Sequence, residues 1–151
     1  MKRSLYLLFV FGSVLTAGRV SAQFRSIPGV VTDSFKVKYP NAANVNWSDK
    51  VSNFQASFTL DKDKFVAKYD SKGVWLGSSK RVTKDEIPAA VKDGLAKSKY
   101  AGSEWAIKAV VVYYNPGNIT QYGIQVSKSD LQKKNLLFSS DGQLLKDNST
   151  L

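Results

Sequence analysis

Side chains able to do covalent or metal chemistry are scarce in this sequence. The 151 residues include no cysteine and no histidine, which excludes disulfides, thiol nucleophiles, haem ligation and the usual zinc sites. The spacing Ser-x-x-Lys of a lysine-assisted serine nucleophile does not occur. Asp61-x-Asp63 lacks the further ligands of a calcium loop. We therefore predict no catalytic residue, no metal site and no cofactor, and a hydrolase built on two distant carboxylates is the least favoured hypothesis.

Aromatic side chains are stronger candidates for function, because they anchor many protein interfaces. Trp75 follows a turn glycine by two residues, and Tyr113 and Tyr114 are adjacent in a predicted strand. Neighbouring strand residues point to opposite faces, so one tyrosine faces away from the core if one face alone is covered. We predict these three as partner-binding residues, with Lys68 and Gln55 as contacts at the rim. The alternative is that Trp75 packs beneath a loop and the outward tyrosine has no role.

Residues 1–22 have the pattern of a secretory signal peptide. Lys2 and Arg3 precede an apolar stretch from Leu5 to Ala17 that is too short to span a membrane, and small residues follow it. We predict cleavage near Ala22/Gln23 and a secreted or periplasmic protein with no transmembrane span. A secreted domain without disulfides favours the bacterial envelope.

The chain is basic, with a formal charge of +10 that falls to +7 when Lys2, Arg3 and Arg19 leave with the leader. The remaining lysines are scattered and form no long basic run, so we predict no nucleic-acid binding. Solubility explains most of this charge. The functional alternative is attraction to an acidic partner or to anionic envelope ligands such as lipid headgroups or acidic glycans.

Two stretches of the chain are similar to each other. Residues 27–31 (IPGVV) recur 60 residues later as IPAAV, and residues 69–76 (YDSKGVWL) recur 69 residues later as FSSDGQLL. Each copy of Ile-Pro would open a helix, because proline suits the first turn. The predicted segments are the signal peptide 1–22, a first repeat 23–84, a second repeat 85–146 and a frayed tail 147–151.

Within each repeat the apolar spacing changes from four residues to two. Helical stripes are formed by Val31, Phe35 and Tyr39, and then by Ile87, Val91 and Leu95. Alternating segments after each helix predict antiparallel strands with one buried and one solvated face. The strands are expected near 45–47, 54–60, 64–70, 74–82, 107–114, 120–127, 136–138 and 144–145.

The order of these motifs resembles a known family. The Ile-Pro helix start, Phe35-x-x-x-Tyr39-Pro40, Val45-x-Trp47 and Tyr69-Asp70-x-x-Gly73-x-Trp75-Leu76 are similar to PepSY-like, beta-lactamase-inhibitor-protein-like (BLIP-like) secreted bacterial domains. The resemblance implies an α+β fold, a tandem repeat of one helix packed on a four-stranded antiparallel sheet, with a concave sheet surface that binds another protein. Disulfides support the inhibitor itself and this chain has none, so the resemblance does not imply inhibition of a beta-lactamase here.

These observations favour a secreted, non-enzymatic binding module. Its open antiparallel sheet face would bind a protein partner in the cell envelope, as an inhibitor or regulator of an envelope enzyme does. The alternative is a basic surface that binds anionic envelope ligands.

Overall fold

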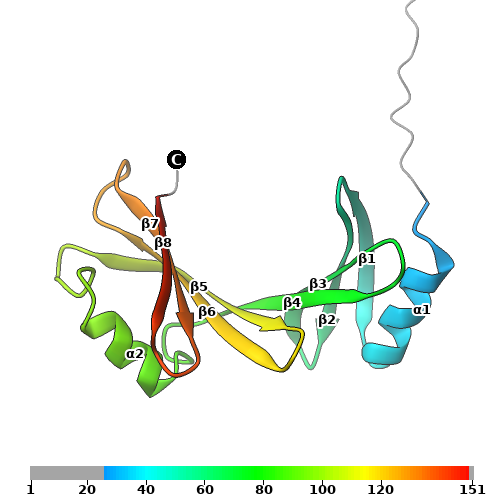
Figure 1. Ribbon diagram of the computed structural model, residues 1–151, viewed down its shortest axis with the longest axis horizontal. Helices are drawn as coiled ribbons and strands as arrows, with labels where there is room; N and C mark the ends of the chain where they lie inside the picture. Colours follow the sequence, from blue (N-terminus) through cyan, green and yellow to red (C-terminus); the bar gives the residue numbers. More distant parts are fainter. Residues whose placement is uncertain (1–25, 150–151) are drawn as a thin grey trace, which may run out of the picture.

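The computed structural model describes residues 26–149, which form one antiparallel sheet of eight strands and two helices (Figure 1). The strands lie in the sheet in the order in which they occur along the chain. The elements are α1 (Gly29–Lys38), β1 (Ala43–Lys50), β2 (Asn53–Leu60), β3 (Asp63–Tyr69), β4 (Trp75–Val82), α2 (Ala89–Ala96), β5 (Ala106–Asn115), β6 (Ile119–Ser127), β7 (Lys133–Ser139) and β8 (Leu144–Ser149).

The continuous sheet overturns the predicted fold class. The sequence analysis expected a tandem of two units, each with one helix on its own four-stranded sheet. Instead β4 pairs with β5, from Ser78 opposite Tyr114 to Val82 opposite Val110, and this pairing joins all eight strands. The connection that contains α2 returns the chain beside β4, so β4 and β5 satisfy each other's backbone groups rather than ending two sheets as exposed edges.

The end of the chain also differs from expectation. Residues 147–149, predicted to fray, complete β8, where Asp147 pairs with Leu136 and Ser149 with Lys134. The predicted signal peptide and its cleavage site near Ala22/Gln23 lie outside the described residues.

Both helices begin after a proline, as the sequence predicts. Pro28 and Pro88 have φ values of −60° and −58° with extended ψ, and they precede the first helical residue. The backbone of Tyr39 leaves the helical region, and Pro40 prevents α1 from continuing. Val31 and Val91, the third residues of α1 and α2, are fully buried.

Each helix rests on a hairpin turn that contains a glycine. Gly73 lies between β3 and β4 with φ +81°, and Gly142 lies between β7 and β8 with φ +90°. A Cβ atom at Gly73 would lie 2.8 Å from the Val30 carbonyl oxygen of α1, and one at Gly142 would lie 2.1 Å from the Ala90 carbonyl oxygen of α2. Both positions need glycine for the turn and for the close approach of the helix.

The helices pack on the same face of the sheet, at its opposite ends (Figure 1). The first core, under α1, consists of Val31, Phe35, Phe54, Ala56, Phe58, Ala67 and Tyr69. The second core, under α2, consists of Ile87, Val91, Tyr100, Val110, Ile124, Val126, Leu136 and Phe138. Strand residues alternate between faces, so every second residue of each strand points away from the helices.

Candidate functional site

The face of the sheet opposite the helices is the candidate binding surface. Residues directly opposite each other in an antiparallel pair point to the same side, so the register assigns each side chain to a face. We call this surface the open face: Asn46, Ser48, Gln55, Ser57, Thr59, Lys64, Val66, Lys68, Gly77, Ser79, Arg81, Val111, Tyr113, Gln121, Gly123, Gln125, Asn135, Leu137, Lys146 and Asn148. None of these positions is an aspartate or a glutamate.

Tyr113 occupies the centre of the open face. Three hollows line this side of the sheet, with volumes of about 1060, 290 and 90 Å³, and Tyr113 contributes to all three. The largest lies over β2, β3 and β4, and the second extends across β6, β7 and β8. The Tyr113 side chain is 37% exposed. An aromatic ring between adjoining hollows can contact a ligand from either side.

A glycine on the neighbouring strand positions the Tyr113 ring. A Cβ atom at Gly123 of β6 would lie 2.7 Å from Cε2 of Tyr113, so the ring occupies the space above the bare backbone. Aromatic side chains commonly cover a glycine across a strand pair in this way. Packing against Gly123 limits the motion of the ring, which lowers the entropy lost when a partner binds it.

Positive charge surrounds the largest hollow. Lys64 and Lys68 on β3 and Arg81 on β4 line it together with Lys62 from the β2–β3 turn. Within residues 26–149, none of these four side chains makes a hydrogen bond or an ion pair. Their charges are therefore available to a ligand.

One ion pair lies at the edge of this hollow. The Lys80 ammonium is 2.6 Å from the Asp63 carboxylate. The hydrogen bond to Asp63 raises the pKa of Lys80 above its ordinary value. Asp63 is thereby neutralised by Lys80, and the net charge beside the hollow remains positive.

The structure separates the five predicted binding residues into two groups. Gln55, Lys68 and Tyr113 lie on the open face, whereas Trp75 and Tyr114 lie on the face that carries the helices. Adjacent tyrosines on opposite faces are what strand geometry requires. Lys64, Arg81 and Gly123 were not among the predicted residues, although alternation along β3 could have assigned Lys64 to the same face as Lys68.

Trp75 and Tyr114 have structural neighbours on the helix-bearing face. The Trp75 ring packs against the first core, and the Lys38 ammonium lies 3.9 Å from its centroid. The ring of Tyr114 lies 6.3 Å from that of Phe65. Neither residue can contact a ligand bound on the open face.

Glu86, in the connection between β4 and α2, has a local hydrogen-bond partner. Glu86 accepts hydrogen bonds from the backbone N–H and the hydroxyl of Thr83, and these bonds lower the pKa of Glu86. No group of three potential metal ligands occurs among residues 26–149.

No family model and no curated protein matches the chain. Solved structures do match. A BLIP-like protein from Bacteroides fragilis is 24% identical over 85% of this chain and 89% of that chain, with a TM-score of 0.77, and at this identity it shows the fold alone. A DUF2874 family protein from Bacteroides uniformis is 27% identical over 81% and 88% of the two chains, with a TM-score of 0.74.

A presumed periplasmic protein from Bacteroides eggerthii is also similar, at 26% identity over 82% and 89% of the two chains and a TM-score of 0.73. These neighbours confirm the resemblance to the BLIP-like fold that the sequence motifs indicated. No neighbour supports the PepSY-like part of that resemblance. In the part of the chain that the structure describes, no helix has the length and apolar character needed to cross a membrane.

Proposed function

We propose that the protein is a non-enzymatic periplasmic binding module and that its open face docks an acidic surface of a partner protein. The observation that carries this proposal is the position of Tyr113, an aromatic anchor where three hollows meet, beside cations that have no partner within residues 26–149. The similarity to a BLIP-like protein and to a presumed periplasmic protein supports it.

Charge indicates the chemistry of the partner. The open face contains lysine and arginine and no acidic residue. Opposite charge on a partner speeds encounter, and like charge excludes other proteins. A protein whose docking surface carries clustered aspartate and glutamate around an apolar recess for Tyr113 fits this face.

The shape of the face favours a folded partner over a flexible polyanion. The hollows extend from β2 to β8 and have apolar as well as cationic lining, including Val66, Val111 and Leu137. Lipid headgroups and glycans would use the cations and leave these apolar side chains unpaired. A protein surface buries both, since interfaces combine an apolar centre with a polar rim.

The test replaces Tyr113 with a photo-crosslinking aromatic residue and exposes the protein to the envelope fraction of its own cells. We expect one discrete crosslinked protein, absent when the same residue replaces Val37, which is 84% exposed on α1. In binding measurements with that protein, Tyr113→Ala should weaken affinity by about 30-fold.

Charge reversal separates docking from general attraction. Lys64→Glu/Lys68→Glu should abolish binding, whereas Lys36→Glu/Lys72→Glu, at exposed positions away from the open face, should reduce it slightly. Equal loss of binding by the two double variants would contradict the protein-docking proposal. So would a Tyr113→Ala variant that binds normally, if anionic vesicles or acidic glycans bind the protein with a steep dependence on salt.

A further inference from the structure

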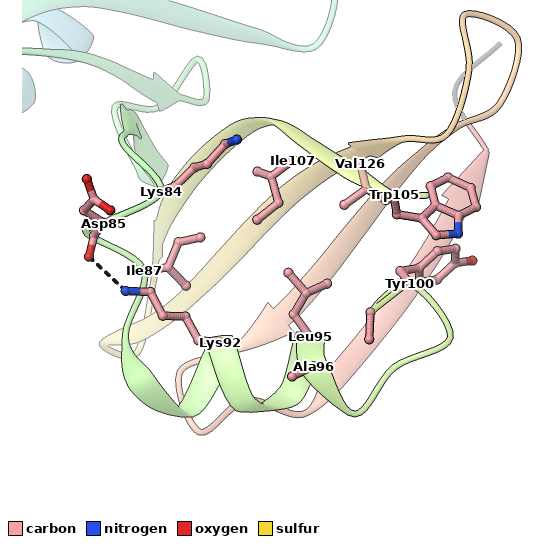
Figure 2. A pocket seen from close by; sticks show the side chains of 11 residues that line it. Lys84, Asp85, Ile87, Lys92, Leu95, Ala96, Tyr100, Trp105, Ile107 and Val126 are labelled. Atoms are coloured by element: carbon pink, nitrogen blue, oxygen red, sulfur yellow. Dashed lines mark hydrogen bonds between the residues drawn. The ribbon is translucent and has the colours of Figure 1, made fainter. Parts of the chain in front are cut away.

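A second cavity lies on the other face of the sheet, between α2 and strands β5 and β6 (Figure 2). Its volume is about 420 Å³, within the range of about 300–1000 Å³ of small-molecule sites. Figure 2 shows side chains from the helix and from the strands lining one space. The apolar lining is Ile87, Leu95, Tyr100, Trp105, Ile107 and Val126.

One side chain that faces the sheet from α2 is smaller than its counterpart in α1. The seventh residue of α1 is Phe35, whose ring contacts the rings of four neighbours. The seventh residue of α2 is Leu95, which remains half-buried together with Trp105 and Ile107. An aliphatic side chain cannot fill the volume that a ring fills, so apolar surface beneath α2 stays without partner atoms.

The opening of the cavity carries basic side chains. The Lys84 side chain makes no hydrogen bond or ion pair within residues 26–149, and it extends along the opening near Ile107 (Figure 2). The Lys92 ammonium contacts the backbone oxygen of Asp85 at 3.2 Å. The carboxylate of Asp85 points away from the apolar lining (Figure 2). Lys84 and Lys92 therefore place an ammonium group at each of two edges of the cavity, the Lys84 group near Ile107 and the Lys92 group beside Asp85 (Figure 2).

We propose that this cavity binds a small anionic amphiphile, a single unbranched apolar chain with a carboxylate head group. The chain would cover Leu95, Ile107 and Trp105, and the carboxylate would pair with Lys84 and displace the Asp85 contact of Lys92. A neutral or cationic head group would lose the ion pairs.

The ligand site is independent of the proposed docking face. Tyr113 and the cations of the open face lie on the opposite side of the sheet. Loss of partner docking through Tyr113→Ala should therefore leave amphiphile binding unchanged, and the two proposals can fail separately.

The test is calorimetric titration with decanoate below its micelle-forming concentration. We expect saturable one-to-one binding, accompanied by a change in the fluorescence of Trp105, which lines the cavity. Decanol and decyltrimethylammonium, which have the same chain, should bind about tenfold more weakly or not at all. Equal binding of all three probes, or the absence of saturable decanoate binding, would overturn the proposal.

Two variants locate the site. Leu95→Phe should fill the cavity and reduce decanoate affinity at least about tenfold, whereas Leu131→Phe, at a loop position 94% exposed, should leave it unchanged. Lys84→Gln should weaken binding about threefold and Lys72→Gln should not. Undiminished binding by Leu95→Phe, with its fold verified by circular dichroism, would place decanoate elsewhere and refute the site.

A last experiment distinguishes a free carboxylate ligand from an amphiphile held in a bilayer. Vesicles of phosphatidylglycerol should not retain the protein at a salt concentration at which decanoate still binds. The proposed free ligand would be contradicted if the vesicles retain the protein, Leu95→Phe abolishes that retention, and free decanoate does not bind.

Discussion

The two ends of the sheet meet their helices in different ways. Under α1, aromatic rings fill the space: the Phe35 centroid lies 5.4 Å from Tyr39, 5.3 Å from Trp47, 5.0 Å from Phe58 and 6.3 Å from Tyr69. Under α2, Val91 is fully buried, but Leu95 lines a cavity of about 420 Å³. The same helical spacing of apolar residues thus fixes where a helix lies, while side-chain volume decides whether the space beneath it is filled.

The buried polar groups of the two ends also differ, and those at the α2 end have more partners. Near α2, the Tyr100 hydroxyl donates a hydrogen bond to the Asp147 carboxylate of β8 at 2.5 Å, and the Lys99 ammonium lies 2.9 Å from the same carboxylate. Near α1, the buried Tyr69 hydroxyl has no hydrogen-bond partner in the structure. Its burial raises the pKa of Tyr69 far above the ordinary value. The α1 end therefore depends on ring packing, and the α2 end combines packing beside a cavity with an ionic contact.

The largest expected effect is the loss of the ring at the centre of the first core. Phe35→Ala should lower the free energy of unfolding by about 4 kcal/mol, because Phe35 is 4% exposed and contacts four rings. Leu95→Ala should cost about 1 kcal/mol, since Leu95 is half-buried beside an existing cavity. Urea unfolding at 25 °C measures both. Similar losses for the two variants would contradict the difference between the ends.

The turns that support the helices give the next prediction. Gly142→Ala should destabilise the protein by about 3 kcal/mol, because φ is +90° and the new Cβ would lie 2.1 Å from the Ala90 carbonyl oxygen. Gly73→Ala should cost less, about 2 kcal/mol, since its closest contacts are 2.8 Å. Gly29→Ala is the matched control, because a Cβ there has nothing within 4 Å. A larger loss at Gly73 than at Gly142 would reverse the ranking of the two turns.

Local patterns predicted the elements well, because each helix and strand is encoded in contiguous residues. The stripes that contain Val31, Phe35 and Val91 are buried as predicted, and Gly73 and Gly142 lie in turns between strands that were predicted on either side of them. The joining of β4 and β5 was not predicted. Their pairing depends on how the long connection through α2 folds back, and no residue pattern in either strand specifies a partner so far away in the sequence.

The candidate site could be predicted only in part. Alternation separates Tyr113 from Tyr114 but does not say which one faces the helices, because valines precede both tyrosines on their own faces of β5. Trp75 lies beyond a register shift between Lys68 and Tyr69, so a count of two residues from its neighbours assigns the wrong face. The cavity beneath α2 was not predicted, because the spacing of apolar residues contains no information on side-chain volume.

The ionic contact at the α2 end should make stability depend on pH. Hydrogen bonds from Tyr100 and Lys99 lower the pKa of Asp147 below its ordinary value of 3.8. As pH falls, the Asp147 carboxylate is therefore protonated in the unfolded chain before it is protonated in the folded protein. The stabilisation is complete above about pH 4 and is lost as pH falls through the lower value of the folded protein.

Asp147→Asn should cost about 1 kcal/mol at pH 7, a modest value because the carboxylate is 23% exposed. The difference between this variant and the parent should shrink toward zero at the most acidic pH at which both remain folded. Urea unfolding at a series of pH values measures it, and Asp141→Asn, at an exposed turn position, is the control. A difference that stays constant with pH would assign the loss to packing of β8 rather than to the carboxylate charge.

The smallest expected effect tests the comparison most directly, because it gives α2 the residue that α1 has. Leu95→Phe should raise the free energy of unfolding by about 0.5 kcal/mol, since a ring can occupy space that is empty and cover Ile107 and Trp105. The gain is small because the ring must adopt one rotamer and because the cavity is open to solvent. A loss of more than about 1 kcal/mol in urea unfolding would mean that the ring meets atoms rather than space. The two ends would then differ in the path of the backbone and not in side-chain volume.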